Sequence, residues 1–153
     1  MNTTTRFSSV LVHLPDVDEA FSKLLHFLEL LQVAVLNNED WPLLEQQFKL
    51  VGALSIKIFR REEEAMDLCG DRSAYTHKAA HQKFLKTLMA IRAKCEAEGP
   101  TVALAQDLRT EVIGWLFDHH RIMNASLGRV VKDMVERSKA HHESTNGAAS
   151  SQG

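Results

Sequence analysis

Proline and glycine are scarce in this 153-residue chain, which contains three prolines and seven glycines. Few residues therefore interrupt a regular backbone, and this composition favours long helices. The chain also lacks an excess of charge of one sign, because 18 lysines and arginines oppose 20 aspartates and glutamates, for a formal net charge of -2. A nucleic-acid partner, which would need a basic surface, is not expected.

Cysteines and long apolar segments are few as well. Cys69 and Cys95 form neither a CxxC pair nor a zinc-type spacing with histidine, so we expect reduced, buried thiols and no disulfide. The longest apolar run, residues 24–36, contains three polar residues and is too polar to cross a membrane. Residues 1–14 lack the apolar centre of a signal peptide. We therefore expect a cytoplasmic protein that does not contact a membrane.

The overall composition is that of an ordinary globular protein, with 44% hydrophobic and 25% charged residues. A chain of this length fits one domain that can bury its own core. Its C-terminal end differs, because it is rich in serine, alanine, glycine, asparagine and glutamine. We predict one helical domain at residues 1–140 and a disordered tail at residues 141–153.

Apolar residues recur at helical spacing in four stretches that are separated by capping and turn signals. Pro42 lies in the first turn of the second stretch, and Gly70 ends it. The predicted helices span roughly residues 18–36, 41–69, 71–99 and 101–140. Because the connections between them are short, we expect an all-α, up-down-up-down four-helix bundle with a longer fourth helix.

Two histidines occupy core positions of the third helix. His77 and His81 lie four residues apart, which places both on one face and allows two imidazoles to converge on a metal ion. Counting 1.5 Å per residue from the turns near residues 71 and 99 places Glu62 and His119 at the same height along the helices as the histidine pair. A buried glutamate needs a cationic partner. The alternatives are histidines hydrogen-bonded within the core and a Glu62 that is solvated with its charged neighbours.

Several segments together resemble the hemerythrin family over about residues 14–128. Residues 58–66 resemble its His-Phe-x-x-Glu-Glu-x-x-Met segment, residues 77–85 its HxxxHxxFL segment, and residues 115–119 its WLxxH segment. Residues 15–18 resemble the segment that precedes its first histidine. The resemblance implies a hemerythrin-like bundle with metal-binding ancestry.

In that family, five histidines and two carboxylates hold two irons, and the resemblance therefore also shows which ligands have changed. Phe21 and Ile58 stand at the positions of the two histidines of the oxygen-binding iron, and Asn124 stands at that of the bridging aspartate. Every ligand of the other iron is retained. The retained ligands are His77, His81, His119 and Glu62. We therefore predict one metal ion, iron in the first instance, with zinc, manganese or nickel also suited to this ligand set.

Several functions are compatible with such a site. The leading hypothesis is sensing or binding of a small ligand, such as dioxygen, nitric oxide or peroxide, or redox sensing. The alternatives are a metal-free interaction module, di-iron dioxygen binding with substituted ligands, and an enzyme that uses the single metal to turn over peroxide or nitric oxide. Val131, Met134 and Val135 on the fourth helix indicate a homodimer or partner-protein surface, or further packing on the chain's own helices.

Overall fold

The protein, described here by a computed structural model, is helical over most of its described residues. The structure describes residues 3–70 and 72–149, and no strand occurs among them. The elements are α1 (Thr3–Leu36), α2 (Trp41–Cys69), α3 (Ala74–Glu98), α4 (Val102–Asp107), the π-helical segment η1 (Leu108–Gly114) and α5 (Trp115–Ala149). The all-helical fold class predicted from the sequence is therefore confirmed.

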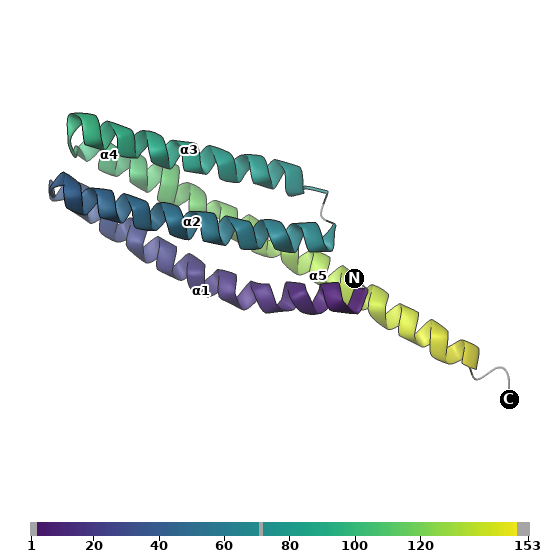
Figure 1. The fold of residues 1–153 in the computed structure, drawn as a ribbon. Coiled ribbons are helices and arrows are strands. Elements are labelled where there is room, and N and C mark those ends of the chain that lie inside the picture. The colour runs from purple at the N-terminus through teal and green to yellow at the C-terminus, as the bar shows by residue number, and fades with distance from the viewer. Residues whose placement is uncertain (1–2, 71, 150–153) are drawn as a thin grey trace.

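Long helices lie side by side in this fold (Figure 1). The helix α1 contacts α2, α4 and α5, and α3 contacts α2 and η1. The segments α4, η1 and α5 follow one another without a turn, so they act as one long helical stretch. None of the helices is both long and apolar enough for a membrane span, as far as the described residues go.

The second predicted helix agrees with α2 at both ends, because its boundary signals are local. Pro42 lies in the first turn, where its missing amide costs no hydrogen bond. Gly70 follows the last turn with φ 65°, a left-handed conformation that glycine adopts without strain. The start of the first helix was predicted wrongly, because α1 begins at Thr3 and continues through Pro15. Proline disfavours a helix interior but does not forbid it.

The fourth predicted helix differs from the structure in its middle, where η1 replaces a regular α-helix. The buried residues Leu104, Leu108, Val112 and Leu116 are each four residues apart. Three such steps would carry a side chain about 120° around an α-helix. The wider turns of η1 absorb this drift. All four side chains therefore remain buried, and His119 enters the interior one turn later.

The buried apolar residues form two clusters, and the polar site lies between them. The larger cluster includes Phe59 on α2 and Leu116 on α5, whereas the smaller consists of Ala65, Met66 and Met123. Along α2, Glu62 falls between the two clusters, and along α5 His119 does the same. A polar layer is thus enclosed by hydrocarbon on both sides.

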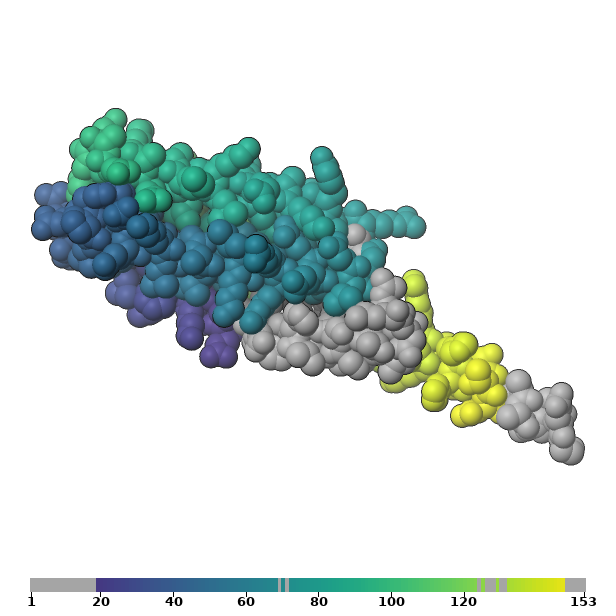
Figure 2. Space-filling view, viewed as in Figure 1, coloured from purple at the N-terminus to yellow at the C-terminus, as the bar shows by residue number. Residues whose placement is uncertain are grey.

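The C-terminal part of α5 extends away from the other helices (Figure 2). Residues 136–147 are exposed, yet the helix continues to Ala149 and includes residues that we expected to be disordered. No proline interrupts this stretch, and the Thr145 hydroxyl donates to the carbonyl of His141 at 3.1 Å. Met134 and Val135 are half-buried. The division at residue 140 and the partner surface stay predictions, and the Val131 side chain lies outside the described ones.

Candidate metal centre

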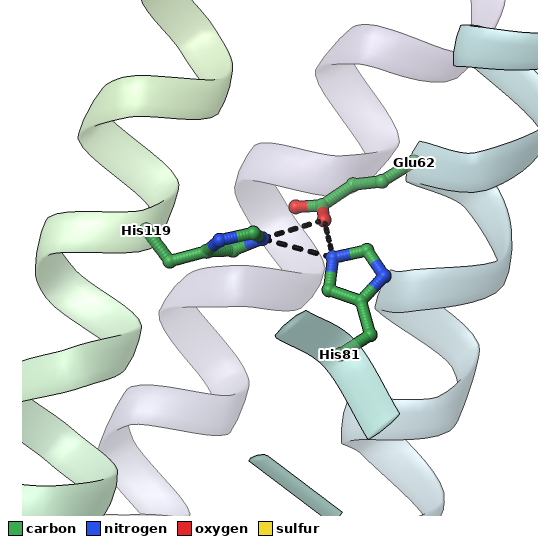
Figure 3. Close-up of side chains that lie close together, drawn as sticks. All are labelled: Glu62, His81 and His119. Carbon is green, nitrogen blue, oxygen red and sulfur yellow. Dashed lines mark hydrogen bonds and ion pairs between the residues drawn. The ribbon is translucent and has the colours of Figure 1, made fainter. Parts of the chain in front are cut away.

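Three buried side chains from three helices converge at one point (Figure 3). Glu62 comes from α2, His81 from α3 and His119 from α5, and their exposed fractions are 2%, 1% and 9%. The His81 Nε2 atom lies 2.9 Å from Glu62 Oε2 and 2.9 Å from His119 Nε2. The third side of the triangle, from His119 Nε2 to Glu62 Oε2, measures 3.4 Å. This group could hold a metal ion.

The three separations fit ligands on adjacent positions around one ion. Metal bonds to imidazole nitrogen and carboxylate oxygen are about 2.1 Å long, so two ligand atoms at a right angle lie about 3 Å apart. The observed separations of 2.9, 2.9 and 3.4 Å lie close to this value. One oxygen and two nitrogen ligands leave further coordination positions for water or a small ligand.

His77, the fourth predicted ligand, lies beside this group but does not share its point of convergence. Its Nδ1 atom is 2.9 Å from the Met66 sulfur and 3.5 Å from the Ser73 hydroxyl. Its ring centre is 6.0 Å from that of His119, at an interplanar angle of 87°. The structure thus brings three of the four predicted residues together, and a ligand role for His77 stays a prediction.

Two aromatic side chains fix the planes of the converging imidazoles. Phe59 stacks on His81 with ring centres 4.0 Å apart and an interplanar angle of 7°. Trp115 stacks on His119 in the same way, at 4.5 Å and 11°. Stacking limits rotation of both rings, so their Nε2 atoms stay directed at each other and at Glu62. The three side chains are therefore held in an arrangement that could accept an ion.

Glu63 also lies at the site, although its position in the sequence does not predict this. Its Oε1 atom lies 3.3 Å from Nδ1 of His81, on the opposite side of the ring from Glu62. A carboxylate in this place favours the tautomer with the proton on Nδ1, in which Nε2 is available as a ligand atom. Glu63 was missed because it lies beside the apolar stripe of α2 and not on it. The only signal was its place next to a glutamate predicted to be buried.

The carboxyl group of Glu62 is ionised despite its burial. Burial raises its pKa, but hydrogen bonds from His119 and His81, together with the charge of these rings, outweigh burial and hold the pKa below its ordinary value. In the metal-free protein, Glu62 therefore stabilises the fold above about pH 4.5, and this contribution is lost as the pH falls through the lower pKa of the folded state.

No family model, curated protein or solved structure matches this chain. Its chemistry must therefore follow from its own geometry. The two apolar residues predicted to replace histidines are both buried, Phe21 at 8% and Ile58 at 1% exposure. Phe21 stacks on His120 with ring centres 3.6 Å apart, which places apolar and aromatic atoms beside the residue that follows His119. The Asn124 side chain lies outside those that the structure describes.

We expect Glu63→Gln to weaken metal binding by about 10- to 100-fold, the effect typical of losing a carboxylate that orients a histidine ligand. The amide keeps the shape of the side chain but holds the His81 proton less firmly, so the fold should be unchanged. Titration of the metal-free protein with Co²⁺, followed by absorption, measures the affinity. Glu29→Gln, at an exposed position of α1, is the control. Equal affinities for both variants would exclude this role for Glu63.

Proposed function

We propose that this chain binds a single metal ion through Glu62, His81 and His119, and that the ion is iron. The convergence of two imidazole nitrogens and one carboxylate oxygen within 3.4 Å, in a buried site, carries the proposal. Two histidines and one carboxylate on adjacent positions are the ligand set typical of non-haem Fe(II). Zinc, manganese and nickel accept the same ligands and are the competing ions.

The charges of the site support a bound cation. When His81 is neutral and its proton lies on Nδ1, where Glu63 accepts it, the lone pair on Nε2 faces a carboxylate oxygen at 2.9 Å. Two electron-rich atoms at this distance repel each other unless a proton or a metal ion lies between them. A metal ion satisfies both atoms at once, together with Nε2 of His119.

The proposal includes a hemerythrin-like, up-down-up-down four-helix bundle. It is supported by the short connections between α1, α2, α3 and α4 and by the contacts among them. It is also supported by the burial of Phe21 and Ile58, which we place where a second ion would otherwise bind. His77 would join as a further ligand by turning its ring away from Met66, since it lies one helical turn from His81.

Bound iron would supply a redox-active centre with coordination positions for a small ligand, and we propose ligand or redox sensing as its role. The ligand is dioxygen, nitric oxide or peroxide. The protein contributes the negative charge of Glu62 and a setting that excludes bulk water, because Phe59 and Trp115 cover the faces of the two imidazoles. Turnover of peroxide or nitric oxide would need the same residues.

A metal-free interaction module is the second candidate, and one observation favours it. A doubly protonated His81 would donate from Nδ1 to Glu63 and from Nε2 to Glu62, which satisfies both carboxylates without a metal. In this case the site is a buried ion pair that stabilises the core. The C-terminal part of α5 would then carry the function by binding a partner or a second copy.

Elemental analysis distinguishes these functions. We would measure metal per chain on protein expressed with added iron and without a polyhistidine tag, and record absorption spectra with and without dioxygen. About one iron per chain, without the bands of an oxo-bridged iron pair, is the expected result. Two irons with those bands would instead support di-iron dioxygen binding, and protein that stays metal-free would support the interaction module.

A further inference from the structure

A hollow on the surface between α2 and α3 is independent of the metal centre. Its volume is about 380 Å³, within the range of small-molecule sites. Ile56 and Met89 border it with exposed fractions of 44% and 65%, so large apolar side chains meet water there. The apolar residues lining it include Phe48, Ile56, Leu85, Leu88 and Met89. An apolar ligand would cover this surface.

Gly52 keeps the hollow open on the α2 side. It lies in the middle of α2, where glycine is less favourable than alanine by about 0.5–1 kcal/mol. A Cβ atom added at this position would meet no atom within 4 Å. Packing within the chain therefore does not require a glycine here. A side chain at position 52 would instead occupy the space of the hollow.

Two cations stand at one end of the hollow and share one carboxylate. Lys49 and Arg92 are the charged residues among the described ones that line it. The Lys49 Nζ atom lies 3.4 Å from Glu45 Oε1, and Nη2 of Arg92 donates to the same oxygen at 3.2 Å. The Nε atom of Arg92 is buried and has no hydrogen-bond partner among the described residues. One positive charge thus remains unbalanced, and the guanidinium uses few of its donors.

We propose that this hollow binds a straight-chain carboxylic acid of about ten carbons. Its carboxylate would accept hydrogen bonds from Lys49 and Arg92, and its hydrocarbon tail would cover Gly52 between Ile56 and Met89. The volume of the hollow, about 380 Å³, is of the size that accepts one single-chain acid of this length.

Titration calorimetry with sodium decanoate on the full-length protein tests the proposal. We expect one site per chain with a Kd of roughly 10–500 μM. Gly52→Leu should weaken binding at least tenfold, because its side chain fills the hollow. Gly147→Leu, on the exposed part of α5, is the matched control and should bind as the original chain does. Circular dichroism confirms that each variant is folded.

The head group is tested separately. Arg92→Gln should weaken decanoate binding at least tenfold but leave binding of decanol, the uncharged analogue, unchanged. Decanoate binding should be the same with and without a metal chelator, so failure of the metal proposal would not affect this result. The proposal is overturned if the original chain takes up no decanoate, if Gly52→Leu binds it normally, or if decanol binds as tightly. Binding to phosphatidylglycerol vesicles without binding of free decanoate would also overturn it and assign this surface to a membrane.

Discussion

Replacing His81 with alanine is expected to reduce bound metal from about one ion per chain to nearly none. His81 is 1% exposed, and its Nε2 atom is the corner of the triangle closest to both other ligand atoms. Removing it leaves two of the three converging ligands, so the loss of affinity should exceed the 10- to 100-fold typical of removing a residue that only orients a ligand. Elemental analysis after extensive dialysis measures the effect.

Two further variants make this experiment decisive. His26→Ala removes an exposed histidine of α1 and should retain the metal. If His81→Ala does not fold, Glu62→Gln tests the same group, because an amide has nearly the shape of a carboxylate and is a poorer ligand. Retention of one ion per chain by both site variants would mean that the metal binds elsewhere, for example at the exposed pair His141 and His142.

Removing the metal with a chelator is expected to lower the Tm by about 8 to 16 °C. An ion at 1,000 times its Kd stabilises the folded state by about 4 kcal/mol, and each kcal/mol shifts the Tm of a chain of this size by about 2–4 °C. The physical cause is that Glu62, His81 and His119 are buried together and lose the cation that holds them. Differential scanning calorimetry at fixed pH, with and without the chelator, measures the shift.

The His81→Ala variant provides the control for this measurement. Its Tm should be the same with and without the chelator, because it has no bound ion to lose. An unchanged Tm in the original chain would contradict the metal proposal and favour the buried ion pair, in which His81 is held between Glu62 and Glu63.

The sequence predicted three of the converging residues because long helices make position along the chain a measure of height. Glu62, His81 and His119 were brought to one level by counting residues from two turns, and the structure brings them within 3.4 Å. Counting does not determine the direction of a ring. It therefore does not show which way the His77 ring turns, and in the structure the Nδ1 atom of His77 is directed at Met66.

Whether a helix end or a site residue could be predicted depends on whether its signal is local in the sequence. The ends of α2 are marked by residues whose backbone preferences are local, namely Pro42 and Gly70, and these ends were predicted correctly. The start of α1 was not, because the helix continues through Pro15. Glu63 was overlooked because its role depends on a neighbouring helix, and such contacts leave no periodic pattern in the sequence.

The π-helical turns at η1 give the chain one residue more than a regular helix would need there. If one residue such as Thr110 were deleted, the buried positions around it would alternate in steps of three and four, and Leu104 and His119 would keep the same inward face. A deletion between Trp115 and His119 would instead rotate His119 by about 100° out of the group. The length of the chain can therefore change by one residue at η1 while the centre survives, whereas nearer to His119 it cannot.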